Sequence, residues 1–203
     1  MRSLILFTLL AAMGCDSSVD DSMDASAPDA AVADAPTSDA PMAASHCGGD
    51  QLLIAAIEPM VSVTLFNPTD TDMDLSGTGW VLCQRPNYIQ LEMIESGVTI
   101  EAGGSHTYAF PSAFTDQGVE DGELVLYRRS AFTNPDAQVD YVCWGSGRAE
   151  NRRSVADEAG LWMGDCAPSI TGTRLTRRPD TDGRSAASYD AAGASGPLSC
   201  PAL

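Results

Sequence analysis

The residues best suited to bind a metal ion lie where carboxylates alternate with other side chains. Asp70, Asp72 and Asp74 have the spacing at which an EF-hand loop begins to surround calcium. Such a loop also needs glycine at its sixth position and glutamate at its twelfth, and this sequence has Leu75 and Val81 there. The segment therefore predicts a solvated turn, with calcium binding as the minor alternative. We expect no metal and no cofactor.

Acid–base catalysis would depend on very few histidines. A hydrolytic triad needs a nucleophile, a base and an orienting acid, and His106 is the only histidine outside the N-terminal region that ends at His46. The sequence contains no G-x-S-x-G, P-loop, H-E-x-x-H or C-x-x-C motif. We expect a protein that is not an enzyme and has no catalytic residues. A hydrolase that uses His106 is the weakest of the alternatives.

Anion binding is the chemistry that the arginines favour, and they account for all eleven basic residues. In segment 148–184 seven arginines face six acidic residues, although the whole chain has a net charge of −17. A guanidinium can bind phosphate or carboxylate bidentately, so a polyanion (nucleic acid or lipopolysaccharide) is an alternative partner. The acidic composition argues against nucleic acid, and salt bridges within the protein are the favoured explanation. The candidates are Arg148, Arg152, Arg153, Arg174, Arg177 and Arg178.

The first residues have the pattern of an export signal. Arg2 precedes an apolar run, Leu4 to Ala12, which is shorter than the ~20 residues that cross a bilayer but fits a signal peptide. Ala12-Met13-Gly14-Cys15 resembles a bacterial lipobox, so residues 1–14 are expected to be removed and Cys15 to carry a lipid. An ordinary cleaved signal would instead leave a secreted protein. The expected location is the bacterial cell envelope, with a membrane anchor on the periplasmic or cell-surface side.

Residues 15–46 are predicted to be the lipidated cysteine and a disordered tether. After Cys15 the stretch is rich in Asp, Ala and Pro and contains no Phe, Tyr, Trp, Lys or Arg. It cannot bury enough apolar surface to offset its conformational entropy. Its seven aspartates repel one another and extend the chain. As a flexible coil it would span ~30 Å and hold a folded domain away from the membrane.

Residues 47–203 have the pattern of one all-β domain with an irregular C-terminal segment. Val61 to Leu65 alternates apolar and polar side chains, which is typical of a half-buried strand. Turn sequences such as Asn67-Pro68 and Gly103-Gly104 separate the apolar runs. Short strands at this spacing predict a sandwich or barrel. Strands are expected at 52–57, 61–65, 80–84, 88–93, 98–101, 106–110, 123–128 and 139–144, and a short helix around 153–159.

Three blocks of this region resemble the lamin-tail domain, an immunoglobulin-like β-sandwich. The first block is similar to that family's first strand, the turn after it and the D-L-S-G-W-x-L segment that follows. The second is similar to its strand before a Gly-Gly turn, and the third to its last pair of strands. The sequence departs from the pattern at Thr64 and at the inserted Thr78-Gly79. The resemblance implies an immunoglobulin-like fold and a non-catalytic module for protein or nucleic-acid contact. The blocks are 63–70 with 73–77 and 80–82, then 98–104, then 122–127 with 139–145.

The cysteines of an exported chain are expected to form disulfides. We expect a bond between Cys83 and Cys143, because both lie in predicted core strands, as in the stapled sheets of immunoglobulin sandwiches. A second bond between Cys47 and Cys200 would join the two ends of the domain. Cys166 would then remain a thiol.

These predictions favour contact with other molecules over catalysis. The expected function is a non-catalytic binding or structural module, anchored to a membrane by its lipid. Its expected partner is an unidentified envelope or extracellular protein, or the matrix. The fold alone cannot choose that partner.

Overall fold

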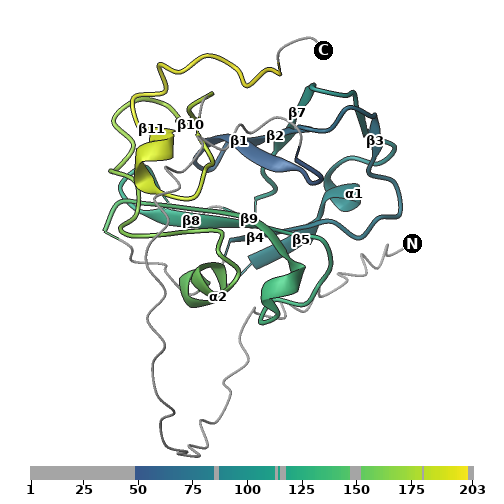
Figure 1. Ribbon diagram of the computed structural model, residues 1–203, viewed down its shortest axis with the longest axis horizontal. Helices are drawn as coiled ribbons and strands as arrows, with labels where there is room; N and C mark the ends of the chain where they lie inside the picture. The colour runs from purple at the N-terminus through teal and green to yellow at the C-terminus, as the bar shows by residue number, and fades with distance from the viewer. Residues whose placement is uncertain are drawn as a thin grey trace, which may run out of the picture.

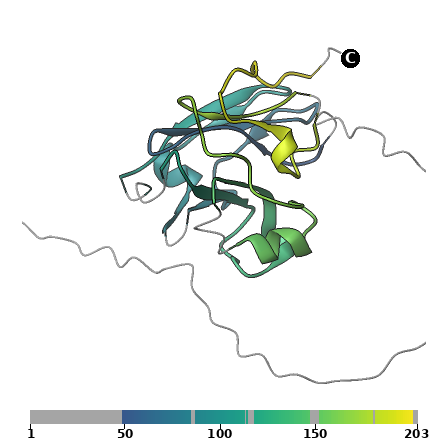
Figure 2. The same ribbon diagram turned by 90° about the vertical axis from the view of Figure 1, so that its left-hand side faces the viewer.

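The chain forms an all-β sandwich in which two antiparallel sheets face each other, as the two layers of Figure 2 show. The computed structural model describes residues 49–84, 87–112, 114, 118–146, 152–179 and 181–200. The predicted signal peptide, Cys15, the tether and Cys47 lie outside these ranges. The all-β prediction is confirmed, because strands dominate and the described helices are short.

The larger sheet has five strands in the order β11-β10-β1-β2-β7. Its centre is a hairpin in which Ile57 of β1 pairs with Val63 of β2. On the other side of β1, Ala56 pairs with Thr176 of β10, so the first strand of the domain joins a strand near its end. The strands are β1 (Leu53–Glu58), β2 (Ser62–Phe66), β7 (Ser105–Ala109), β10 (Leu175–Arg177) and β11 (Tyr189–Asp190).

The turn between β1 and β2 projects apolar side chains into solvent. Val61 N donates to Glu58 O at 2.9 Å, and Pro59 and Met60 occupy the two central positions. Met60 has a φ of 62°, a left-handed conformation that normally favours glycine. Met60 and Val61 are 50% and 52% exposed. The hairpin end is therefore both strained and apolar.

The second sheet has four strands in the order β5-β4-β8-β9. Every residue of β8 and β9 is buried. One face of this sheet packs against the larger sheet, and α2 (Arg153–Glu158) lies against the other face (Figure 1). Burial on both faces explains the nearly continuous apolar sequence of these strands. The strands are β4 (Val81–Gln84), β5 (Asn87–Gln90), β8 (Gly122–Tyr127) and β9 (Gln138–Trp144), with a 3-10 turn, η1 (Pro135–Ala137), before β9.

The strand predicted for residues 88–93 ends early, and this prediction is partly wrong. A one-turn helix, α1 (Leu91–Ile94), follows β5 directly. Leu91 N donates to Trp80 O at 2.9 Å, which places the Leu91 side chain in the core, while Met93 is 66% exposed. The alternating apolar residues suited a strand as well as a turn of helix. A two-stranded sheet of β3 (Met73–Asp74) and β6 (Thr99–Ile100) closes this end of the sandwich.

The C-terminal segment is more regular than the sequence indicates. The short helix expected around 153–159 is confirmed as α2. Beyond it, β10 and β11 complete the larger sheet. A 3-10 turn, η2 (Ala186–Ser188), directly precedes β11. The last described residues cross the outer face of that sheet, where Leu198 packs on Ala55 and Phe66. Figure 1 shows this crossing above β1 and β2.

Candidate functional site

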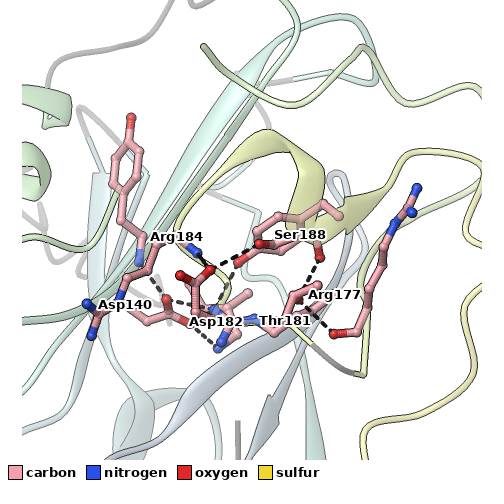
Figure 3. Close-up of polar contacts among 10 residues, drawn as sticks. Asp140, Arg177, Thr181, Asp182, Arg184 and Ser188 are labelled. Atoms are coloured by element: carbon pink, nitrogen blue, oxygen red, sulfur yellow. Dashed lines mark hydrogen bonds and ion pairs between the residues drawn. The ribbon is translucent and has the colours of Figure 1, made fainter. Parts of the chain in front are cut away.

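The strongest polar interaction of the domain lies between the two sheets (Figure 3). Arg177 projects from β10 of the larger sheet and Asp140 from β9 of the second. Arg177 Nη2 donates to Asp140 Oδ1 at 2.8 Å and to Oδ2 at 2.6 Å. The two side chains are only 1% and 6% exposed. The ion pair therefore links the sheets through the core.

Other core groups also contact this pair, although Arg177 Nε and Nη1 are buried with no hydrogen-bond partner among the described residues. The Asp140 carboxylate also accepts from Ile54 N at 2.6 Å and from Tyr141 N at 3.0 Å. Arg177 Nη2 donates to the Tyr189 hydroxyl at 2.9 Å, and Arg177 Cζ lies 5.5 Å from the centre of that ring, within cation–π range. Salt bridges within the protein are expected from the sequence, but local pattern cannot locate this one, because Asp140 and Arg177 are 37 residues apart and lie on different sheets.

The protonation of the pair follows from its contacts. Burial raises the pKa of the Asp140 carboxyl, while the charge of Arg177 and the backbone donors lower it. Burial alone would lower the pKa of Arg177, but the charge of Asp140, the interaction with Tyr189 and the hydrogen bonds to both together hold that pKa above its usual range. The hydrogen-bond partners of the carboxylate among the described residues are all donors, so they offer no acceptor for the proton of a protonated Asp140. The pair is therefore ionised.

A tight loop seals the pair from solvent. A Cβ at Gly183 would overlap the Arg177 guanidinium, so only glycine fits against it. Asp182 Oδ1 accepts from Arg184 N at 3.0 Å and from Ser188 Oγ at 3.3 Å, which fixes the shape of the loop (Figure 3). The anion that Arg177 binds is therefore Asp140 of the protein itself, and the pair joins the two sheets.

The arginine candidates do not gather on one face. Arg177 and Arg152 are buried, at 0% and 6% exposure. Arg153 is half-buried and its guanidinium donates to Gly164 O. Arg174 and Arg178 are exposed on either side of β10. Arg148 lies outside the described residues.

A second buried polar cluster lies under the start of α2. The Glu123 carboxylate is fully buried and accepts from the Tyr141 hydroxyl at 3.1 Å and from Arg152 N at 3.3 Å. Arg152 Nε and Nη2 are buried without a hydrogen-bond partner. Sequence reasoning missed Glu123, because it occupies a strand position where an outward-facing acid would be expected.

The aspartates at 70–74 serve the turn that contains them. Asp72 Oδ1 accepts from Ala102 N at 3.0 Å and Asp74 Oδ1 from Ser76 N at 2.9 Å. Hydrogen bonds from the backbone and side chain of Ser76 lower the pKa of Asp74. Within the described ranges, no three His, Cys, Asp or Glu side chains are grouped so that they could hold a metal ion.

His106 lies on β7 and contacts a carboxylate. Its Nε2 is 3.0 Å from Glu95 Oε2, and its ring meets the Tyr108 ring edge-on at 4.7 Å. Among the residues that the structure describes, no serine, threonine or cysteine hydrogen-bonds to it. His106 therefore has an acidic partner, Glu95.

The predicted disulfide between Cys83 and Cys143 is wrong. Cys143 of β9 is bonded to Cys166, at a Cα separation of 5.0 Å, and Cys83 is a buried thiol. Cys83 lies on β4, which is separated from β9 by β8, whereas residues 166–167 run beside β9. Cys200 is disulfide-bonded, and its predicted partner Cys47 lies outside the described residues.

No protein-family model, curated protein or solved structure matches the chain. Of the helices that the structure describes, none has both the length and the hydropathy required to span a bilayer. The residues and their geometry must therefore carry the functional argument.

Proposed function

We propose that this chain is a non-catalytic binding or structural module of the bacterial cell envelope that contacts another protein or the matrix. In this proposal residues 1–14 are a lipoprotein signal peptide, Cys15 carries the lipid and residues 16–46 are a disordered tether. The sandwich is the lamin-tail-like, immunoglobulin-like domain that the tether presents.

The burial of two candidate arginines favours such a module over an anion-binding protein. Arg177 is the most deeply buried of the candidate arginines, and it forms an ion pair with Asp140 of the other sheet. Arg152 is likewise buried beneath α2. Two of the arginines that would form an anion-binding face are therefore buried in the protein, where a polyanion cannot reach them.

The exposed hairpin end supports a role in contact. Met60 and Val61 lie at a turn that two antiparallel strands hold rigidly, and both are about half exposed. Strained residues persist where the surrounding structure fixes them, and they are frequent at binding sites. A turn whose backbone is already fixed loses little backbone conformational entropy when a partner covers it.

The anchor is tested by intact mass and cell fractionation. A chain that begins at a diacylated or triacylated Cys15 and is found with membranes supports the proposal, and Cys15→Ala should release it. An unlipidated chain that begins elsewhere would make the protein a free secreted one. Cys83→Ala is the matched control, because it changes a cysteine that is buried in the sandwich.

The contact is tested by photo-crosslinking in cells. A crosslinking residue at Met60 should capture one envelope protein reproducibly, and the same residue at Met163, which is 61% exposed, serves as the comparison. Failure to capture any envelope protein from either position would contradict the proposal. Salt-dependent binding to DNA or lipopolysaccharide would favour a polyanion partner instead.

A further inference from the structure

Strand β7 forms an open edge of the larger sheet. In the order β11-β10-β1-β2-β7 it has one neighbour, β2. Figure 1 shows β7 beside β2, at the margin of the upper layer. A strand with an open side presents unpaired backbone groups to any extended chain that reaches it.

The outward-facing backbone groups can be identified from the register. Asn67 N donates to Gly104 O at 2.9 Å, and Phe110 N donates to Val61 O at 2.8 Å. Because hydrogen-bonded pairs alternate in an antiparallel ladder, the even-numbered residues of β7 face β2. Ser105, Thr107 and Ala109 direct their N–H and C=O groups away from it, and their side chains are exposed. None of the described residues makes a backbone hydrogen bond to these three.

The outer edge of β9 is covered at its end. Gly145 N donates to Ala167 O at 2.7 Å and Ala167 N to Cys143 O at 2.9 Å, so the end of β9 is covered and the Cys143–Cys166 disulfide holds the cover in place. Strand β11 has two residues, and β5 continues directly into α1. By contrast, β7 contains no lysine, arginine, proline or bulge that would discourage pairing.

The surroundings of β7 are acidic. Residues 87–112 contain Glu92, Glu95 and Glu101 and no lysine or arginine. Glu95 contacts His106 of β7, and Asp72 binds Ala102 N in the turn that precedes the strand. These carboxylates would attract a basic chain. They would repel a second copy of this protein, which brings the same charges to the same edge.

We propose that the β7 edge binds an extended, basic polypeptide segment by strand addition. The outward N–H and C=O groups of Ser105, Thr107 and Ala109 would supply the main-chain hydrogen bonds, and the flanking carboxylates would select for basic side chains. This inference rests on the proposed binding function and assigns the surface and the chemistry of the partner.

The probe is a short fluorescein-labelled peptide of alternating lysine and valine, titrated into the purified, oxidised chain. Thr107→Pro removes an outward N–H that β2 does not use, and a proline is tolerated at such an edge position. Thr107→Val is the matched control, because it keeps the N–H and removes only the hydroxyl that contacts Thr64 at 2.9 Å. Loss of one main-chain hydrogen bond should weaken binding by at least about fivefold in the proline variant relative to the valine variant.

Charge and backbone are tested separately. Glu101→Lys should weaken binding about threefold without altering the ladder, which keeps the proposal testable if the proline variant fails to fold. Two further peptides should bind at least about tenfold more weakly than the lysine–valine peptide. One alternates glutamate and valine, and the other is the lysine–valine peptide methylated at alternate backbone nitrogens. Amide hydrogen exchange at Ser105, Thr107 and Ala109 should slow when the lysine peptide is bound.

Several results would overturn the inference. No binding at about 1 mM peptide, equal affinity of the proline and valine variants, or equal binding of the acidic peptide would each do so. Self-association of the chain through β7, seen by sedimentation, would assign the edge to a second copy. If the peptide fails while crosslinking at Met60 still captures an envelope protein, the β7 assignment is wrong and the proposed function stands.

Discussion

Replacing Arg177 by methionine tests whether the buried ion pair is a structural link. The substitution keeps an unbranched apolar stem of similar reach and removes the charge. Asp140 would keep the donors Ile54 N and Tyr141 N but would lose both bonds from Arg177, and Tyr189 would lose its donor. We expect the folded state to tolerate this poorly, because a carboxylate would remain inside the protein without a counter-charge.

The size of the effect follows from the burial of the pair. Removal of one partner of a buried ion pair typically costs about 3–5 kcal/mol, and both side chains here are less than a tenth exposed. Domains of this size are usually stable by about 5–15 kcal/mol. Arg177→Met should therefore remove a large share of the free energy of unfolding and lower the Tm by roughly 10 °C.

Urea unfolding at neutral pH, followed by tryptophan fluorescence, measures this cost. Trp162 reports on the cluster, because its ring lies 5.8 Å from the ring of Tyr189. Arg178→Met is the matched control, since Arg178 is the exposed neighbour and its replacement should change the free energy of unfolding by no more than about 0.5 kcal/mol. Equal effects of the two substitutions would refute the reasoning.

A double-mutant cycle separates the pair from the packing around it. Asp140→Asn alone should also destabilise, because it leaves Arg177 charged in the core. The combined Asp140→Asn and Arg177→Met variant removes both charges of the pair, so its cost should fall below the sum of the single costs by about 2 kcal/mol or more. Additive costs would show that the two charges do not stabilise each other.

Three further predictions concern other parts of the fold. Replacing Cys143 and Cys166 by alanine should lower the free energy of unfolding by about 3 kcal/mol, because the disulfide closes a loop with a sequence separation of 23 residues; calorimetry that shows no loss would contradict this. Burial, with the charge of Glu95, raises the pKa of Tyr108 to about 12. Unfolded tyrosines lose their proton near pH 10, so the contribution of Tyr108 to stability should fall between pH 10 and 12 by up to about 3 kcal/mol, and Tyr108→Phe should make the decline in alkaline urea titrations shallower. Gly145→Ala places a Cβ on top of the Glu120 carbonyl oxygen, whereas Gly77→Ala, also at positive φ, meets nothing within 4 Å. The first should therefore cost at least about 2 kcal/mol more than the second in thermal melts.

Most strands could be predicted from the sequence, because their signals are local. Alternation over 61–65 and the turn at Asn67-Pro68 identify β2 and its end, and Asn67 proves to be buried with its amide bonded to three backbone carbonyls. Strand β10 could not be found in this way. It has three residues, Leu175 to Arg177, and one of them is an arginine that faces the core.

Long-range pairing could not be predicted from local pattern. The sequence identifies Cys83 and Cys143 as residues of buried strands, and both are buried. It does not indicate that β4 and β9 belong to the same sheet with β8 between them, where Cys83 lies opposite Val125 and Val125 opposite Tyr141. The partner of Arg177 could not be predicted for a related reason. Composition counts the charges of a chain but does not show which opposite charge each one contacts.

The pairing of β1 with β10 has a consequence for how the chain acquires its fold. Ala56 cannot reach Thr176 until almost the entire domain has been synthesised. One side of β1 therefore stays unpaired while the intervening strands emerge, which gives the sandwich a high contact order and slow folding. During that interval the exposed β1 is a site for intermolecular pairing. Chains truncated before β10 should aggregate, and the yield of native protein should depend on how long nascent chains are kept apart.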